Sequence, residues 1–389
     1  MDRFLTDFIR KDMDKKIILL SGPRQAGKTT LSKSLVEDFD YFTYDDVAHR
    51  LLLKERNWDR RKPLVIFDEL HKMPSWKTWL KAIYDVEGLP PSIVVTGSAH
   101  LDAFREMGDS LAGRFFSYRL HPFDVKEVAH AMEPSEALRR IMTVGGFPEP
   151  FLENDATFYA RWKKTHLDVI VRQDMLDLTA ISDIKSIETL IELLRARVGS
   201  PVSYTNLGND LQKDAKTVKS WLQLLEDLYV VFPVRPWHDN IARAILKEPK
   251  YYFFDTGQVK GNEGARLENA VACSLRKNLE FLEDTRGVAV SLHYLRTKDN
   301  KELDFAIAID GLITHAMEVK LSDSNRSPAF DSFAPALKDA RKIQLVANID
   351  REKTWPDGLL VTDAASYLAE MDLISTEPSG NRSHRAARR

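Results

Sequence analysis

Residues that suit phosphate chemistry stand near the start of the chain. Residues 22–29 read Gly-Pro-Arg-Gln-Ala-Gly-Lys-Thr, between an apolar stretch at 15–21 and a stretch at 30–36 with apolar residues at helical spacing. In a strand-to-helix turn, glycines let successive backbone N–H groups point at anionic oxygens, and the helix N-terminus adds partial positive charge. The pattern predicts a phosphate-binding loop (P-loop) that binds ATP, made by Gly22, Pro23, Arg24, Gln25, Ala26, Gly27, Lys28, Thr29 and Thr30.

Side chains in and after this loop suit hydrolysis of the nucleotide. Lys28 is expected to reach the β- and γ-phosphates, and Thr29 to supply a hydroxyl to Mg²⁺. The apolar strand 64–67 ends in Asp68-Glu69, so Asp68 is expected to hold Mg²⁺ through water and Glu69 to polarise the attacking water. The alternative is a pair of acids that merely caps the strand.

Residues of two later segments are candidates for contact with the γ-phosphate. A third apolar strand, 92–98, ends in hydroxyl residues, and Thr96 or Ser98 is positioned to bond the phosphate or the water, unless this is an ordinary turn. Arg114, at the end of Ser-Leu-Ala-Gly-Arg, is a candidate arginine finger on the ATP of a neighbouring subunit. That role implies a homo-oligomer, whereas the alternative is a surface arginine in an ion pair.

A second candidate site lies in the last third of the chain. Glu268 begins a helical stretch, Asp304 lies in strand 302–309, and Glu318-Val-Lys320 follows an Asp-Gly hairpin turn. Because side chains alternate along a strand, Glu318 and Lys320 share a face. This ordered set resembles the PD-(D/E)xK nucleases, which implies that Asp304 and Glu318 hold Mg²⁺, Lys320 orients or deprotonates water and Glu268 completes the acidic shell. The alternative is a nuclease-like fold without cleavage.

The middle of the chain is expected to be helical. Residues 158–178 have helical spacing, and two short helices at 203–211 and 215–228 precede a strand at 229–234. Helix, turn, helix and strand is the layout of a winged helix, whose second helix would face DNA through Lys213, Lys216, Thr217, Lys219 and Ser220. The alternatives are an ordinary packing stripe and a module for protein contacts.

Composition limits the remaining possibilities. The chain has 389 residues, 56 basic and 58 acidic, and a net charge of −2, so any nucleic-acid surface must be a local patch. Its single cysteine, Cys273, excludes an intrachain disulfide and a thiolate-rich metal site. The apolar runs are too short to span a bilayer, and no signal-like apolar segment opens the chain. A cytoplasmic protein without a membrane partner is therefore expected, with a disordered basic tail at 373–389.

Taken in order, these motifs resemble a known family. The P-loop, Ile-Phe-Asp-Glu-Leu-His-Lys at 66–72, Val-Thr-Gly-Ser-Ala at 95–99 and Ser-Leu-Ala-Gly-Arg at 110–114 are similar to those of AAA+ ATPases of the AAA_14 type. Gly-Gly-Phe-Pro-Glu at 145–149, Lys-Tyr-Tyr-Phe-Phe-Asp-Thr-Gly at 250–257 and Leu-Glu-Asn at 267–269 resemble landmarks of proteins with a C-terminal DUF4143 region. The resemblance implies ATP binding and hydrolysis.

The sequence thus predicts an α/β chain with several parts. They are an AAA+ ATPase core at 1–125, a helical lid or linker at 126–195, a winged-helix-like domain at 196–248 and a DUF4143 domain with a PD-(D/E)xK-like fold at 249–372. ATP and Mg²⁺ are the expected cofactors. One hypothesis is an ATPase that remodels or translocates DNA. The other is a nucleotide-controlled regulatory switch that works through protein contacts.

Overall fold

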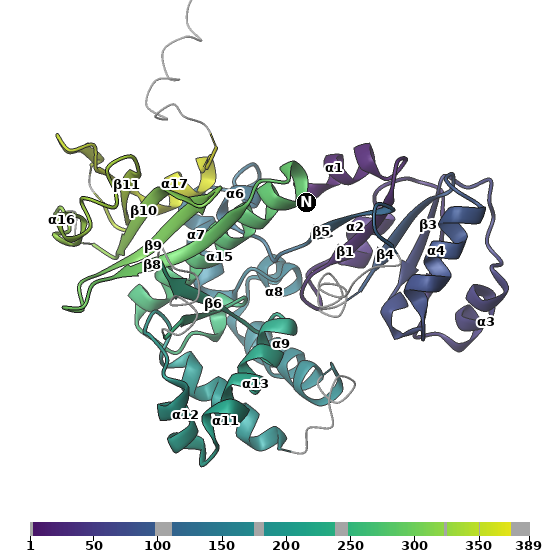
Figure 1. The fold of residues 1–389 in the computed structure, drawn as a ribbon, viewed down its shortest axis with the longest axis horizontal. Helices are drawn as coiled ribbons and strands as arrows, with labels where there is room; N and C mark the ends of the chain where they lie inside the picture. The colour runs from purple at the N-terminus through teal and green to yellow at the C-terminus, as the bar shows by residue number, and fades with distance from the viewer. Residues whose placement is uncertain are drawn as a thin grey trace, which may run out of the picture.

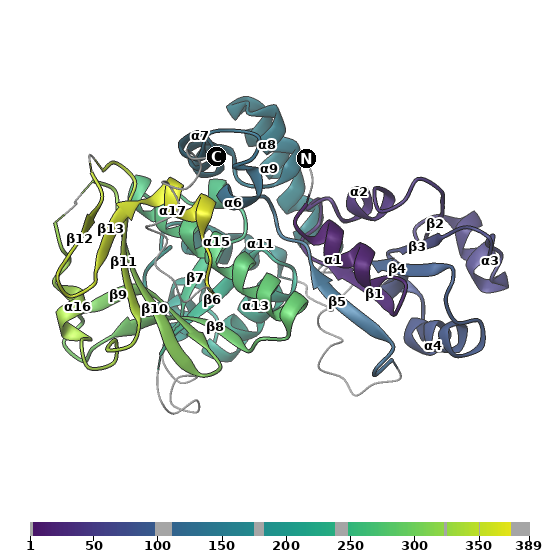
Figure 2. The same ribbon diagram turned by 90° about the horizontal axis from the view of Figure 1, so that it is seen from above.

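The computed structural model describes residues 3–97, 111–174, 183–237, 248–322, 325–349 and 351–374. Two β-sheets lie at opposite ends of the long axis, and the middle helices lie between and below them (Figure 1). The view from above shows strand β5 (Phe115–Arg119) leading from the N-terminal lobe toward the rest of the chain (Figure 2). The overall class is α/β, as predicted.

The N-terminal lobe is built on a five-stranded sheet with the order β2-β3-β4-β1-β5. All its neighbouring strands pair in parallel. Strands β1, β3 and β4 are buried along their whole length, which is why they read as continuous apolar runs rather than as alternating patterns. The elements before β5 are α1 (Leu5–Asp12), β1 (Ile17–Ser21), α2 (Lys28–Lys33), β2 (Phe39–Thr43), α3 (Val47–Glu55), β3 (Leu64–Asp68), α4 (Trp76–Val86) and β4 (Ser92–Thr96).

Each face of this sheet has its own hydrophobic core. Ile17 and Leu19 of β1 pack into one cluster with α4, whereas Ile18 and Leu20 pack into the other with α1 and α2. This division follows from the alternation of side chains along a strand. Both faces of the sheet are therefore covered, and a ligand would bind at the carboxyl ends of its strands.

The middle of the chain is helical, as predicted. The expected helix at 158–178 begins earlier and continues after α9 as one π-helical segment, Ile170–Asp174. Asp155, Asp183, Ser203 and Asp214 each cap a helix by accepting a bond from a backbone N–H three residues on. The helices are α6 (Val125–Val128), α7 (Pro134–Val144), α8 (Pro148–Glu153), α9 (Ala156–Val169), α11 (Ile184–Arg195), α12 (Tyr204–Leu211) and α13 (Ala215–Asp227).

The second sheet has eight strands in the order β12-β13-β11-β10-β9-β8-β6-β7. The hairpin β6/β7 follows α13 and joins this sheet, because β6 pairs in parallel with β8. The elements are β6 (Val231–Pro236), β7 (Lys250–Phe253), α15 (Glu263–Arg286), β8 (Val290–Arg296), β9 (Glu302–Ile309), β10 (Leu312–Lys320), α16 (Ala329–Ser332), β11 (Arg341–Val346), β12 (Lys353–Thr354), β13 (Leu360–Asp363) and α17 (Ala364–Glu370).

One hydrophobic core joins the middle helices to this second sheet. It includes Val125 of α6, Leu190 of α11, Leu222 of α13, Leu275 of α15 and Leu368 of α17. The boundaries expected at 195/196 and 248/249 stay predictions, but the segments on either side of them share buried side chains. The long helix α15 contacts both β8 and β5, so it connects the second sheet with the N-terminal lobe.

Candidate nucleotide-binding site

The predicted P-loop connects the carboxyl end of β1 with the start of α2. Gly22 and Gly27 have φ angles of 136° and 97°, and Gln25 also has a positive φ of 64°. A Cβ at Gly22 would lie 2.3 Å from the Leu120 carbonyl oxygen. The glycines are therefore required by backbone conformation, and at Gly22 also by close approach to the chain after β5.

Lys28 is directed into this loop. Its side chain is buried, and its ammonium donates to the carbonyl oxygens of Gly22 and Pro23, each at 2.8 Å. The loop backbone thus holds the lysine at the strand edge where a phosphate would meet the N-terminus of α2. Pro23, Arg24, Gln25, Ala26 and Thr30 lie in the same turn and first helical residues, as the sequence predicted.

Asp68 is the meeting point of three hydroxyl groups. Thr29 Oγ1 donates to Asp68 Oδ2 at 3.0 Å and the Tyr41 hydroxyl to the same oxygen at 2.7 Å, whereas Thr96 Oγ1 donates to Oδ1. Strand register explains the convergence, since Asp68 lies beside Thr96 on β4. A hydroxyl and a carboxylate oxygen are ligands that Mg²⁺ prefers, so Thr29 and Asp68 fit the expected cofactor. The sequence did not reveal Tyr41, whose pKa is raised by burial and by Asp68.

Glu69 follows Asp68 in a left-handed conformation with φ 54°. Its backbone N–H donates to the Thr96 carbonyl oxygen at 3.0 Å, which fixes the turn against β4. Burial raises the pKa of the Glu69 carboxyl, and the charges of Lys72 and Lys28 oppose this rise. A carboxylate with a raised pKa is a better proton acceptor than an ordinary glutamate.

Two side chains from outside the sheet also contact the P-loop, and the sequence analysis assigned neither of them. Arg3 donates to the Ala26 carbonyl oxygen at 3.0 Å, and His166 Nε2 lies 3.2 Å from the Arg24 carbonyl oxygen. Burial lowers the pKa of His166 to about 4, so the ring is neutral near pH 7 and Nε2–H donates. His166 also stacks on Trp162 with a centroid distance of 4.4 Å. In the sequence, the i,i+4 spacing of Trp162 and His166 indicates that the two rings can stack on one helix face, but it does not indicate contact with the P-loop.

Arg3 begins a buried chain of ion pairs that leads away from the P-loop. Its Nε lies 3.0 Å from Glu127 Oε1, and Glu127 Oε2 lies 2.5 Å from Lys277 Nζ on α15. Burial alone raises the pKa of Glu127, but the charges of Arg3 and Lys277 hold it down at about 2. Lys277 also pairs with Asp124 at 2.9 Å.

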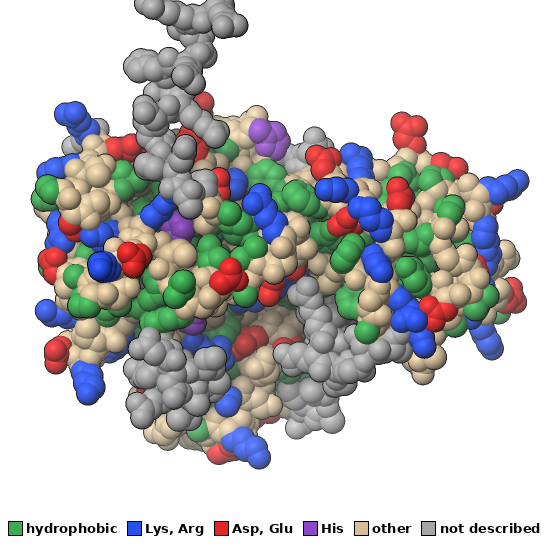
Figure 3. Space-filling model, turned by 45° about the horizontal axis from the view of Figure 1, so that its top comes forward, with side chains coloured by type: hydrophobic (Ala, Val, Ile, Leu, Met, Phe, Trp, Pro, Cys, Tyr) green, Lys and Arg blue, Asp and Glu red, His purple; other side chains and the backbone are tan. Residues whose placement is uncertain are grey.

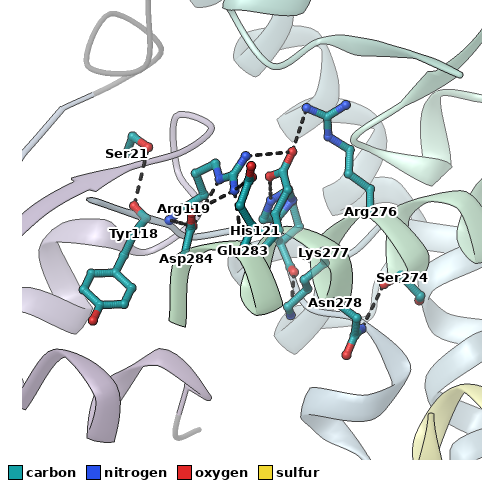
Figure 4. A network of polar contacts seen from close by, with 12 residues as sticks. Ser21, Tyr118, Arg119, His121, Ser274, Arg276, Lys277, Asn278, Glu283 and Asp284 are labelled. Carbon is teal, nitrogen blue, oxygen red and sulfur yellow. Dashed lines mark hydrogen bonds and ion pairs between the residues drawn. The ribbon is translucent and has the colours of Figure 1, made fainter. Parts of the chain in front are cut away.

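Strand β5 carries a second set of contacts to the same helix (Figure 4). Arg119 pairs with Asp284 at 2.7 Å and with Glu280 at 3.4 Å, and it also contacts Glu283. His121 Nε2 lies 2.5 Å from Glu280 Oε2. The end of the N-terminal sheet is therefore fastened to α15 by buried charges.

Arg114 is a predicted site residue that is not brought to the P-loop of its own chain. Arg114 directly precedes β5, at the amino ends of the strands and thus at the edge opposite the P-loop, and its Nε pairs with Asp85 at 2.6 Å. It does not reach the nucleotide site of its own chain, so an arginine-finger role in a neighbouring subunit stays a prediction. Ser98 lies outside the described residues.

The second predicted site is assembled from the expected elements. Glu268 lies on α15, Asp304 on β9, and Glu318 and Lys320 on β10, with Lys320 Nζ 2.6 Å from Glu318 Oε1. Glu268 and Glu318 are close enough to Asp304 to raise its pKa further, after burial, well above the ordinary value. Within the described ranges, however, no group of three or more His, Cys, Asp or Glu side chains is arranged to hold a metal ion.

Three protein-family models match consecutive parts of the chain. Residues 14–129 match the AAA domain family AAA_14, residues 135–261 match a domain of unknown function (DUF8612), and residues 263–366 match a second such domain (DUF4143). In the parts of the chain that are described, no helix combines the length and apolar character needed to cross a membrane.

Relatives and solved structures show a more distant likeness. An uncharacterized protein of Mycobacterium tuberculosis is 27% identical, covering 87% of this chain and 78% of its own. One of Methanocaldococcus jannaschii is 25% identical, covering 86% and 82%. Among solved structures, RuvB of Thermotoga maritima matches at 16% identity with a TM-score of 0.30, over 58% of this chain and 85% of its own. A Signal Transduction ATPase with Numerous Domains from Pyrococcus horikoshii matches at 12% with a TM-score of 0.25, over 73% and 47%.

The P-loop geometry and the family match lead to the same conclusion. Residues 14–129 form an AAA_14-type P-loop ATPase domain, and the chain joins it to a C-terminal DUF4143 region.

Proposed function

We propose that this protein binds ATP with Mg²⁺ and hydrolyses it at the P-loop. The observation that carries the proposal is the 3.0 Å contact of Thr29 Oγ1 with Asp68 Oδ2, beside the buried ammonium of Lys28. Mg²⁺ would neutralise charge on the β- and γ-phosphates. Lys28 would bind the γ-phosphate, Thr29 and Asp68 would hold the ion, and Glu69 would accept the proton of the attacking water.

Substitutions in the loop test this proposal. We expect Lys28→Ala to abolish binding of a fluorescent ATP analogue, and Thr29→Ala to retain weak binding that no longer depends on Mg²⁺. Thr165→Ala is the matched control, because Thr165 bonds only the Arg161 carbonyl oxygen on the surface of α9. Mg²⁺-dependent hydrolysis that survives Lys28→Ala unchanged would place the ATPase site elsewhere.

We propose further that the nucleotide state is transmitted to the C-terminal region. The contacts that support this are Arg3 on the Ala26 carbonyl oxygen, Arg3 on Glu127, and Glu127 on Lys277 of α15. A P-loop that moves on binding phosphate must carry these partners with it or break buried bonds, and breaking them is costly. This connection favours the regulatory switch, in which ATP controls the protein contacts of the C-terminal region.

Action on DNA remains the second candidate, and helix α13 supports it. Lys216, Lys219 and Ser220 are exposed along this helix, as a DNA-facing helix requires. Lys213 pairs instead with Asp183 at 2.6 Å, and Thr217 bonds Asp214 at 2.6 Å. On the face drawn in Figure 3, Lys and Arg side chains are interspersed with Asp and Glu, so a DNA surface on this face would be confined to a small area.

Salt dependence of DNA binding separates the two candidates. If α13 faces DNA, Lys216→Glu/Lys219→Glu should reduce the slope of log affinity against log salt by about 1.8, since each phosphate contact contributes about 0.9. Lys11→Glu/Lys54→Glu, with the same charge change at exposed positions of the N-terminal lobe, should leave the slope unchanged. Absence of binding at low salt, together with an ATPase rate that DNA does not alter, would leave the switch as the function.

A further inference from the structure

A lysine that was not predicted as a site residue lies among the carboxylates of the second candidate site, Glu268, Asp304 and Glu318. Lys250 is the first residue of β7, and its side chain is 1% exposed. Its ammonium lies 2.5 Å from Glu302 Oε1, 3.5 Å from Glu268 Oε1 and 3.8 Å from Asp304 Oδ1. A buried cation therefore already lies among the side chains that would have to bind a metal.

Other protein groups also bond the oxygens of these carboxylates. The Tyr252 hydroxyl donates to Glu268 Oε1 at 2.7 Å, and the Val319 N–H donates to Asp304 Oδ2 at 2.8 Å. Ser327 and Lys320 contact Glu318 Oε1 at 3.4 and 2.6 Å, whereas Glu318 Oε2 is buried and has no hydrogen-bond partner among the described residues. Oxygens already engaged by protein groups are less available to a Mg²⁺ ion, which needs about six oxygen ligands in octahedral geometry.

Cations of the protein face the carboxylates of this cluster. Burial and the neighbouring carboxylates raise the pKa of Asp304 well above its ordinary value, and its Oδ1 lies 3.8 Å from the Lys250 ammonium. The remaining carboxylates face an equal number of cations, because Glu268 and Glu302 contact Lys250, Arg296 lies 3.4 Å from Glu302, and Lys320 pairs with Glu318. These cations offset negative charge that would otherwise attract a divalent ion.

Backbone from the middle of the chain also closes the cluster. A Cβ at Gly199, between α11 and α12, would lie 2.6 Å from Glu268 Oε2. The neighbouring Pro201 forms a β-bridge with Lys250 itself. Glycine at 199 thus allows this loop to lie directly on the carboxylate, and the same loop holds the strand that carries the lysine.

We infer that Lys250 is the resident cation of the Glu268–Asp304–Glu318 cluster in place of a divalent metal ion, so the cluster is an ionic joint between the middle and C-terminal segments. A Mg²⁺ ion bound at about 2.1 Å from Asp304 Oδ1 would lie within about 6 Å of the ammonium, and the two cations would repel each other. The DUF4143 region then lacks a Mg²⁺ nuclease centre, whatever the ATPase domain acts on.

Binding of Mn²⁺, followed by electron paramagnetic resonance, tests this inference. The titrations use the full chain without nucleotide and with Asp68→Asn, which removes the carboxylate expected to hold the ion at the P-loop. We expect no tight Mn²⁺ site with Lys250 in place, and one gained site in Lys250→Met that Glu318→Gln removes again. Lys213→Met is the matched control, because it breaks a lysine–aspartate pair on the surface of the middle segment.

A second variant is needed in case Lys250→Met does not fold. Removal of a buried cation leaves carboxylates unpaired and can unfold a protein, so Lys250→Met/Glu302→Gln removes one carboxylate charge together with the lysine. The inference is overturned if the chain with Lys250 binds Mn²⁺ in a manner that Glu318→Gln abolishes. It is equally overturned if the folded Lys250 variants gain no site, or if Mg²⁺-dependent DNA cleavage by the purified chain is lost in Glu318→Gln.

Discussion

Replacement of Arg3 by methionine should loosen the P-loop and helix α15 together. Arg3 bonds the carbonyl oxygens of Ala26 and His121, pairs with Glu127 at 3.0 Å and lies over the Phe123 ring at 4.7 Å. Methionine keeps most of the apolar contact but removes every bond and the charge. The P-loop and the part of α15 around Lys277 should then unfold locally more often, although neither segment has been changed in sequence.

The size of this effect can be worked out from the pKa of Glu127, the carboxylate that pairs with Arg3. The pKa of Glu127 is lowered from 4.5 to about 2, against burial and chiefly by Arg3 and Lys277. At about 1.4 kcal/mol per pKa unit, this shift corresponds to about 3 kcal/mol of stabilisation of the ionised, paired state. The charge of Arg3 is the largest single cause that lowers the pKa of Glu127, and the lost bonds of Arg3 to carbonyl oxygens add to the cost. A total near 3 kcal/mol corresponds to roughly a hundredfold change in a local opening equilibrium.

Hydrogen exchange measured by mass spectrometry is the suitable assay. In Arg3→Met, amides of the P-loop and of α15 around Lys277 should exchange roughly a hundredfold faster than in the parent chain. Arg10→Met is the matched control, because Arg10 lies on α1 and also bonds two carbonyl oxygens, those of Leu35 and Ser34, but is half exposed. Faster exchange confined to α1, or equal in both variants, would refute the proposed connection.

The pH dependence of the protein's stability tests the same pairing of Arg3 with Glu127. Because the folded-state pKa of Glu127 is depressed, its contribution to stability is present above about pH 4.5 and is lost as pH falls toward 2. In Arg3→Met the depression shrinks, so this part of the acid dependence should shrink with it. The thermal unfolding midpoint, measured between pH 5 and 3, should therefore decline less steeply in the variant than in the Arg10→Met control.

Further predictions concern the nucleotide site. Glu69→Gln should retain ATP binding, and its rate of hydrolysis should fall by about 10²–10⁴-fold. Glu69 accepts a proton only when it is ionised, so its raised pKa should place the acid limb of the parent's kcat profile above pH 4.5. A kcat that does not change with pH in this range would exclude the role. Tyr41→Phe removes one hydroxyl from Asp68 and should raise the Mg²⁺ concentration for half-maximal rate about tenfold, without affecting affinity for Mg²⁺-free nucleotide. If Arg114 acts on a neighbouring subunit, mixtures of Arg114→Ala and Lys28→Ala chains should regain activity; no regain would assign Arg114 only its ion pair with Asp85.

Local sequence predicted the N-terminal lobe well because its signals are contiguous. A P-loop needs glycines where φ is positive and a strand and helix on either side, and all of these lie within residues 15–36. The strand that ends in Asp68 was equally visible as an apolar run buried on both faces. Parallel pairing then brings Asp68 beside Thr96 without any further information from side chains.

Contacts between distant segments could not be predicted in this way. Tyr41 on β2 reaches Asp68 only because β2 pairs with β3, and nothing in the residues around Tyr41 marks it as part of the site. The helix expected at 158–178 was visible, but its contact with the P-loop through His166 depends on how α9 packs. For Arg114 the motif indicated a catalytic role, whereas the structure pairs it with Asp85 at the far edge of the sheet.

The chain by itself therefore determined which residues form the P-loop, which acids follow the second buried strand, and which carboxylates gather on β9, β10 and α15. The tertiary structure decided what surrounds them: Arg3 and Glu127, separated by 124 residues, meet beside the P-loop, and Lys250 enters the acid cluster. The physical reason is that a turn or a strand end is specified by neighbours in sequence, whereas the field around a buried charge is set by whichever segments pack against it.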